Sequence, residues 1–196
     1  MRTVTVVPGL VLDEELYGLA EAGLWAFAPG LVACTWEWFT DPANWALIPD
    51  PSCFGYKAEL LLQRAAERTT KINLWMGPDL RAGETPKPHN HPWEQFTAHV
   101  LAGGYLETRY EPSPQGGAPV VQDRSHSAGG RNIVPKATFH EVIEVADPGR
   151  TLTLMDCGPG IQGQWGYMDP HTGEFSANEP DPAFSARLRQ LNPQLR

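Results

Sequence analysis

The sequence has little charge and no long apolar run. Charged residues make up 19% of its 196 residues, the formal net charge is −8, and no basic stripe follows the chain. A nucleic-acid partner is therefore not expected, because its phosphates would require clustered Lys and Arg. The longest uncharged run, residues 22–36, contains Pro29 and is shorter than the ~20 apolar residues that cross a bilayer. We therefore expect no membrane partner either.

Cysteine is scarce as well. Cys34, Cys53 and Cys157 are far apart, odd in number and form no CxxC motif. This pattern is typical of reduced thiols rather than of a disulfide framework. The first twelve residues carry one basic residue and Pro8, so they do not resemble a secretory signal. A soluble, cytoplasmic protein is the simplest expectation.

Glycine, proline and tryptophan are plentiful by contrast, at 19, 19 and 7 residues. This composition favours a loop-rich β protein over a helical bundle. The chain is long enough to bury a core as one folded unit.

Helical patterns occur mainly near the two ends. Asp13 is a suitable N-cap for a helix that Pro29-Gly30 would end. The spacing of Leu60, Leu61 and Ala65 predicts a second helix over 57–68. Asp181-Pro182 predicts the start of a helix close to the C-terminus. Residues 3–7 predict a short strand, and residues 36–54 are expected to be irregular.

The middle of the chain alternates with period two. Several short strands separated by turn residues indicate a sandwich, a jelly roll or a small barrel. Loops are expected at 111–117 and 123–130. The predicted strands cover residues 72–76, 87–91, 94–101, 104–110, 119–122, 131–134, 139–145 and 151–157.

Three histidines stand out in this region. His89 and His91 are two residues apart and share a face if the chain is extended there, and His140 lies in a second segment. Imidazole binds zinc, iron, copper and nickel, usually from three protein ligands that leave positions open. An HxH pair alone is a weak signal, because two polar residues at a strand edge have the same pattern.

The spacing around these histidines resembles the two motifs of the cupin superfamily. Gly83, five residues, then His89 and His91 match the first motif, which ends at Gly103. In the second motif, Gly129, Pro135 and His140 match, whereas Ala137 replaces Gly and Glu144 replaces Asn. The two matching segments are residues 83–103 and 129–144.

The resemblance implies a mainly β fold: a cupin double-stranded β-helix, or jelly-roll barrel, with N-terminal helices and a C-terminal helix. The barrel is expected over 71–167. A helical or irregular extension would precede it at 1–70, and a tail with a helix would follow at 168–196, all in one folded unit. A homodimer is a further option, since cupins commonly pair through barrel edges.

One position departs from the motif in a way that bears on chemistry. Phe96 occupies the place of the glutamate ligand, so the chain is similar to the three-histidine subset that includes thiol dioxygenases and diketone-cleaving dioxygenases. Glu94 lies two residues earlier. It is predicted to be a displaced fourth ligand or a hydrogen-bond acceptor for a ligating histidine, and a surface carboxylate is the alternative.

Other polar residues are predicted to hold the substrate or take part in catalysis. For Arg109, a salt bridge with Glu107 or Glu111 is the slightly favoured alternative. Tyr105 and Tyr167 are equally expected to be packing residues with an accessible hydroxyl. An inward-facing Glu144 would need an arginine partner or would act as an acid or base. His99, His126 and His171 are expected outside the site, with His126 in a loop. The predicted substrate-binding or catalytic residues are Glu94, Tyr105, Arg109, Glu144 and Tyr167.

The resemblance and the ligand set lead to one main functional hypothesis. We expect a mononuclear non-heme oxygenase that acts on a small polar or amino-acid-like substrate, with Fe(II) favoured, while Zn, Ni, Cu and Mn remain options. Three neutral ligands leave the ion's charge uncompensated, which favours an anionic substrate. A metal-dependent isomerase, lyase or hydrolase using Glu94 or Glu144 as acid or base is the second hypothesis. A non-catalytic small-molecule-binding cupin is the third.

Overall fold

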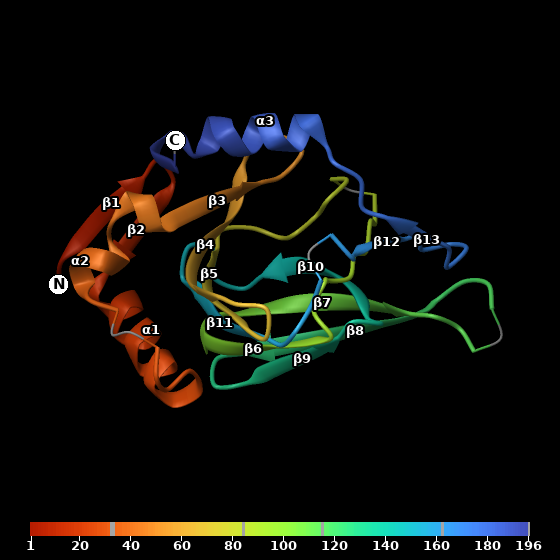
Figure 1. The fold of residues 1–196 in the computed structure, drawn as a ribbon, viewed down its shortest axis with the longest axis horizontal. Helices are drawn as coiled ribbons and strands as arrows, with labels where there is room; N and C mark the ends of the chain where they lie inside the picture. Colours follow the sequence, from red (N-terminus) through yellow and green to blue (C-terminus); the bar gives the residue numbers. More distant parts are fainter. Residues whose placement is uncertain (32–33, 84, 115, 162, 196) are drawn as a thin grey trace.

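The computed structural model describes residues 1–31, 34–83, 85–114, 116–161 and 163–195, and is mainly β (Figure 1). A six-stranded antiparallel sheet, in the order β3-β4-β5-β11-β6-β9, faces a three-stranded sheet in the order β10-β7-β8. Side chains from both sheets line one interior cavity, so the two sheets enclose a barrel. The barrel strands are β3 Trp45–Pro49, β4 Gly55–Arg64, β5 Thr69–Trp75, β6 Gln95–Ala102, β7 Gly104–Glu111, β8 Val120–Ser127, β9 Arg131–Pro135, β10 Phe139–Val145 and β11 Thr151–Cys157.

Strand β4 replaces the helix predicted over 57–68, so that prediction is wrong. Backbone hydrogen bonds join β4 to β3 on one side and to β5 on the other. Ala58 and Leu60 pack into the main hydrophobic core, while Lys57 faces the barrel interior. Because both faces are partly covered, the period-two pattern is weak in the sequence, and sheet pairing overrides the local helix propensity.

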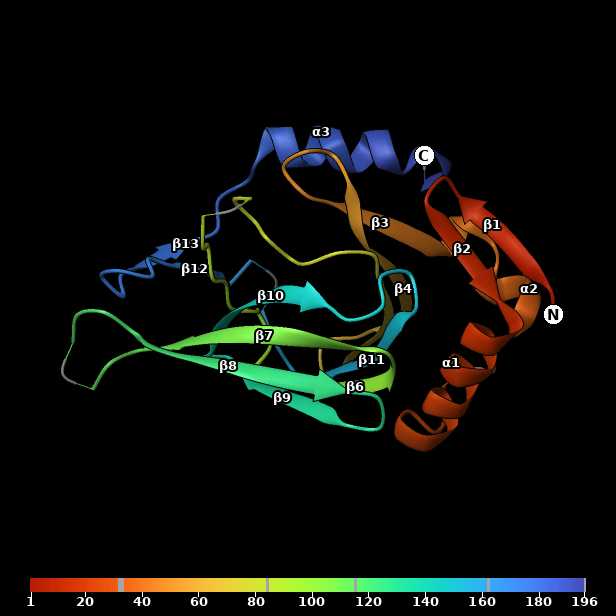
Figure 2. The same ribbon diagram turned by 180° about the vertical axis from the view of Figure 1, so that it is seen from behind.

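The N-terminal segment closes one side of the barrel (Figures 1 and 2). Strands β1 (Thr3–Val7) and β2 (Leu10–Asp13) form a hairpin, and helix α1 (Glu14–Phe27) follows with Asp13 as its N-cap. The Asp13 carboxylate accepts a 2.9 Å hydrogen bond from the backbone N–H of Leu16, as the sequence predicts. Apolar residues of α1 share a core with Leu152 and Leu154 of β11, so α1 covers the outer face of the larger sheet.

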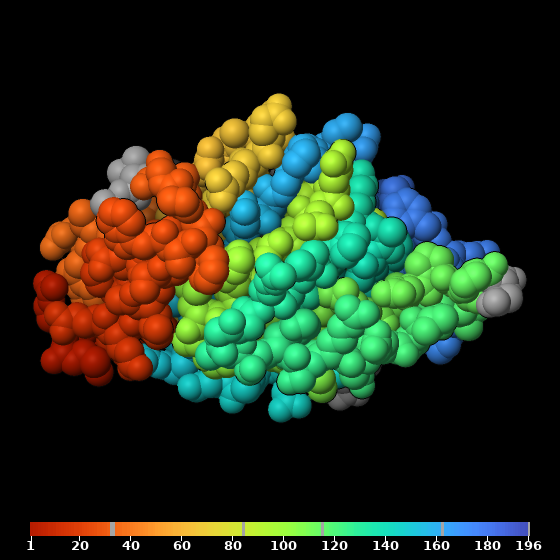
Figure 3. Space-filling model, turned by 90° about the horizontal axis from the view of Figure 1, so that it is seen from below, coloured from red at the N-terminus to blue at the C-terminus, as the bar shows by residue number. Residues whose placement is uncertain are grey.

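The region 36–54, predicted to be irregular, contains short regular elements: α2 (Trp36–Phe39), a 3-10 turn at Pro42–Asn44, and β3. Space-filling Figure 3 shows the N-terminal part packed against one end of the barrel and the β7–β8 hairpin extending at the other end.

The predicted C-terminal helix is confirmed as α3, Pro182–Leu191, with Asp181 as N-cap. It lies across β3 on the outside of the barrel (Figure 1). After the helix, the amide of Asn192 accepts from the N–H of Leu47 at 2.6 Å and donates to its carbonyl at 2.8 Å. These two hydrogen bonds attach the tail to strand β3. A short hairpin, β12 (Gly166–Met168) and β13 (Phe175–Ala177), precedes α3, and a 3-10 turn at Pro193–Leu195 follows it.

Two further expectations are corrected. Residues 87–91 form no strand; isolated bridges at His89 and hydrogen bonds of Lys87, Pro88 and Asn90 tie this segment to its neighbours. Residues 123–127 belong to β8 rather than to a loop, since they pair with residues 104–108 of β7. No helix within the described part of the chain is long and apolar enough to cross a membrane.

Candidate metal centre

The three predicted histidines meet inside the barrel. Their ring centres lie 5.0 Å (His89–His91), 5.2 Å (His89–His140) and 5.1 Å (His91–His140) apart. The backbones of His89 and His140 exchange two hydrogen bonds, at 3.1 and 2.9 Å. This single bridge attaches the loop before β6 to strand β10. Figure 1 shows this loop crossing in front of β10.

The geometry fits one metal ion. One nitrogen of each ring lies within 4.8 Å of the others, and Nε2 of His91 is 2.8 Å from Nε2 of His140. Three imidazoles that bind one ion at ~2.0–2.1 Å place their ring centres about 5 Å apart. In addition, Nδ1 of His89 is buried without a hydrogen-bond partner in the described structure, a costly arrangement that a ligand would relieve.

Burial also keeps two of the rings neutral. It lowers the pKa of His89 well below its usual value, and the positive charge of Arg81 adds to this effect. Burial likewise lowers the pKa of His91, with further contributions from His89, His140, Lys71 and Lys57. Neutral imidazole is the state that binds a metal, so His89 and His91 are in the protonation state of a ligand near neutral pH.

Glu107 supports the third ring, a role that the sequence alone did not predict. Its Oε1 accepts a 2.6 Å hydrogen bond from Nδ1 of His140, and its other oxygen accepts from His126 at 3.0 Å and Asn132 at 3.1 Å. Burial raises the pKa of Glu107, but the hydrogen bonds from both histidines and the charge of Arg109 outweigh burial and hold the pKa below its usual range. An ionised Glu107 keeps the proton on Nδ1 and leaves Nε2 free for a metal.

Two predicted acidic residues do not reach the site. Glu94 is exposed and is absent from the group of side chains that could share an ion, so its prediction as a ligand is wrong. Its backbone bonds instead to Pro159 and Lys136. Glu144 is exposed too, because a β-bulge between Val142 and Glu144 shifts the register of β10. It therefore neither pairs in the interior nor reaches the histidines.

Arg109 and Tyr105 lie close to the histidines, but both have partners. Arg109 is buried and forms an ion pair with Glu107 at 3.0 Å, which was the slightly favoured alternative. It also donates to the backbone carbonyl of Ile133 at 2.9 Å. The Tyr105 hydroxyl accepts a 3.0 Å hydrogen bond from Asn132, and burial raises its pKa. Tyr105 lines the histidine cavity, whereas Arg109 does not.

His126 extends from β8 to Glu107 and was wrongly expected in a loop. In the sequence, the one sign of the hydrogen-bond network around Glu107 is that Tyr105, Glu107 and Arg109 are two residues apart and so share one face of a strand. His99 lies outside the barrel, stacked on Phe27 of α1 with ring centres 3.8 Å apart, as expected from its parity.

The cavity beside the histidines is small, about 40 Å³. Apolar side chains, including Phe96, Ala98, Val142 and Met155, form part of its wall. Lys57, Lys71 and Asn73 add a polar wall from β4 and β5. Lys71 and Trp93 also line an outer hollow of about 420 Å³, which we call the mouth. The mouth therefore adjoins the histidine cavity at these two residues.

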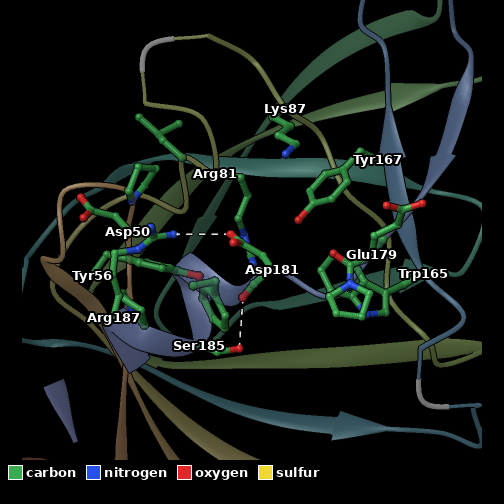
Figure 4. A pocket seen from close by; sticks show the side chains of 16 residues that line it. Asp50, Tyr56, Arg81, Lys87, Trp165, Tyr167, Glu179, Asp181, Ser185 and Arg187 are labelled. Atoms are coloured by element: carbon green, nitrogen blue, oxygen red, sulfur yellow. Dashed lines mark hydrogen bonds and ion pairs between the residues drawn. The ribbon is translucent and has the colours of Figure 1, made fainter. Parts of the chain in front are cut away.

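A second cavity, of about 290 Å³, lies beneath α3 (Figure 4). Tyr167 lines this cavity and not the histidine cavity, so the structure does not place it where a substrate would meet the three rings. Arg81 lies between the cavity beneath α3 and the histidines. It lines the cavity beneath α3, and its guanidinium lies 3.4 Å from Nε2 of His89 and 3.1 Å from the carboxylate of Asp79. Burial raises the pKa of Asp79, but the charges of Arg81 and Lys57 outweigh it and lower the pKa to about 2.

Two antiparallel sheets enclose the three convergent histidines, so the predicted mainly β barrel is confirmed. No protein-family model matches the chain, and no curated protein matches it. Solved structures match at low similarity. KdgF from Halomonas sp. is 16% identical with a TM-score of 0.40, over 55% of this chain and 82% of KdgF.

A double-stranded β-helix protein from Klebsiella pneumoniae is 14% identical with a TM-score of 0.39, over 59% of this chain and 86% of that one. Vicilin from hazelnut (Corylus avellana) is 9% identical with a TM-score of 0.44, over 59% of this chain and 31% of vicilin. Similarity at this level says nothing about activity or substrate. Membership of the three-histidine dioxygenase-like subset therefore stays a prediction.

Proposed function

We propose that this protein is a mononuclear metal enzyme of the oxygenase type, with Fe(II) held by His89, His91 and His140. The observation that carries the proposal is the triangle of three imidazoles, with ring centres 5.0–5.2 Å apart and no carboxylate in the group. Such an all-imidazole set leaves the ion its full positive charge and positions open for other ligands. Ferrous iron bound there would supply the electrons that activate dioxygen and a Lewis-acid site for a substrate.

The residues around the triangle serve this chemistry by positioning and by excluding water. Glu107 orients His140 through the 2.6 Å hydrogen bond. Phe96 lies edge-on to His91, with ring centres 4.9 Å apart, and Trp93 stacks on the same ring, with ring centres 5.6 Å apart. These contacts hold His91 in place and keep bulk water from the cavity. A Lewis-acid isomerase, lyase or hydrolase is less well supported, because Glu94 and Glu144 do not lie at the histidines.

The first test measures the ion and the activity separately. Untagged protein is analysed for bound metals, and oxygen consumption is then recorded with a panel of small thiols, amino acids and hydroxy acids. We expect close to one iron per chain and substrate-dependent oxygen uptake. Zinc without uptake would favour Lewis-acid chemistry, and metal without any turnover would favour a binding protein.

The matched variants are His140→Ala and His171→Ala. His171 is exposed in a turn, so its replacement should leave the metal content and oxygen uptake unchanged. His140→Ala should lose both. Retention of stoichiometric iron in His140→Ala would contradict the proposed ligand set.

A further inference from the structure

Two lysines share the wall of the histidine cavity. Lys57 comes from β4 and Lys71 from β5, and their side chains are only 9% and 13% exposed. Both contact the same carboxylate oxygen, Oε1 of Glu59, at 3.0 and 2.7 Å. Each ammonium group has three N–H donors, so each keeps donors for another acceptor.

The charges at this wall do not balance. Glu59 supplies one negative charge for two ammonium groups. Two other buried ion pairs near the cavity, Asp79 with Arg81 and Glu107 with Arg109, are each balanced. When both lysines are protonated and Glu59 is ionised, the group of Lys57, Lys71 and Glu59 carries one net positive charge. Both lysines also lie over aromatic rings, Lys57 over Trp75 at 5.0 Å and Lys71 over Trp93 at 5.6 Å, and an anion in the cavity would compensate the remaining net charge.

Asn73 provides a second, independent observation. It lies between Lys71 and Trp75 on the same face of β5, lines the cavity and is 1% exposed. Its Oδ1 is buried and has no hydrogen-bond partner in the described structure. Native proteins rarely leave such an atom unpaired. A hydroxyl or amino group on a ligand would satisfy it.

Size and access limit the ligand. The cavity of about 40 Å³ has room for roughly three water molecules, at ~10–15 Å³ each, which suits a carboxylate with its neighbouring atom. Lys71 and Trp93 border both this cavity and the mouth. The rest of a larger molecule would therefore lie in the mouth, against Trp93 and Trp165.

We propose that the cavity binds an α-hydroxy or α-amino acid, with the carboxylate between Lys57 and Lys71 and the adjacent hydroxyl or amino group on Asn73. This inference rests on the proposed function, in that the acid is the substrate class of the same metal site. A purely structural role for the lysines, as partners of Glu59, predicts no dependence of ligand binding on their charge.

The experiment compares acids with their neutral amides. Binding of L-lactate and L-lactamide, and of phenyllactate and its amide, is measured by calorimetry on protein whose metal content has first been determined. In at least one pair, the acid should bind about tenfold or more tightly than the amide, the size expected for hydrogen bonds to a charged group. Lys57→Met and Lys71→Met should each reduce this preference severalfold while metal content and the circular-dichroism spectrum stay unchanged.

The controls distinguish a lysine-bound anion from one attracted by the metal. Lys136→Met removes a lysine that lines neither the cavity nor the mouth and should bind as the wild type does. If the preference for the acids persists in both cavity variants, the metal alone attracts the anion and the inference is overturned. A metal-containing wild type that shows no preference in either pair would overturn it as well. Protein that binds no metal would instead contradict the proposed function.

Discussion

Nδ1 of His140 donates a 2.6 Å hydrogen bond to Oε1 of Glu107, a carboxylate with no solvent-exposed surface. The ring of His140 at the candidate metal centre is thus fixed by a short hydrogen bond to a buried anion, whereas His89 lies 3.8 Å from the buried carboxylate of Asp79. Ordered partners of this kind orient a ligand and raise its basicity. Because Glu107 lies on β7 and His140 on β10, the pairing of these two strands places the carboxylate that orients this candidate ligand.

Glu107→Gln should weaken metal binding by ~10–100-fold, because the amide orients His140 less firmly and stabilises its Nδ1–H less. A competition titration with a chromophoric chelator measures the change. Glu144→Gln is the matched control, since Glu144 is exposed on the neighbouring strand. Equal affinities for the two variants would show that the hydrogen bond to Glu107 has no part in holding the ion.

Strand β4 yields a test at two adjacent leucines. Leu60 is fully buried, whereas Leu61 is 40% exposed. Leu60→Ala should lower the free energy of unfolding by about 2–5 kcal/mol through lost burial and a cavity, and Leu61→Ala by less than about 1 kcal/mol. Urea unfolding monitored by fluorescence measures both. Similar losses at both positions would fit the helix that the sequence predicted, in which the two residues share a buried stripe.

This contrast shows where the sequence is informative. The resemblance of the histidine motif predicts the barrel and its candidate ligands, because the matched positions name His89, His91 and His140 directly, although residues 87–91 form no strand. The β-bulge after Val142 has no such signal, so Glu144 was placed on the wrong face. Glu107 was missed as a support for His140 because that contact depends on how β7 pairs with β10, which only the assembled sheet determines.

Glu59 makes the unfolding free energy depend on pH. Burial raises its pKa, but the charges and hydrogen bonds of Lys71 and Lys57 outweigh burial and lower the pKa from 4.5 to about 2. A carboxylate with a lowered pKa stabilises the fold above its unfolded pKa and loses this contribution as pH falls through the folded pKa. The contribution, about 3.5 kcal/mol at most at ~1.4 kcal/mol per pKa unit, should therefore disappear between pH ~4.5 and ~2.

The measurement is urea unfolding of the metal-free protein at pH 5 and pH 3. Wild type should lose more unfolding free energy over this interval than Glu59→Gln, which cannot titrate at that position. Other carboxylates affect both proteins alike, so the difference isolates Glu59. An identical loss in the two proteins would mean that ionised Glu59, paired with the two lysines, does not contribute to the pH dependence of the unfolding free energy.

Metal removal should destabilise the protein, and only when the three rings are intact. A ligand that binds the folded state alone stabilises it by about 2.7 kcal/mol at a concentration of 100 times its dissociation constant. For a chain of this size, such a gain raises the melting temperature by roughly 5–10 °C. Differential scanning fluorimetry with Co²⁺, which tolerates air, followed by excess EDTA, should show this rise and its reversal. His140→Ala should show neither, whereas His171→Ala should match the wild type. A rise that survives in His140→Ala would place the ion elsewhere on the chain and remove the basis for the oxygenase proposal.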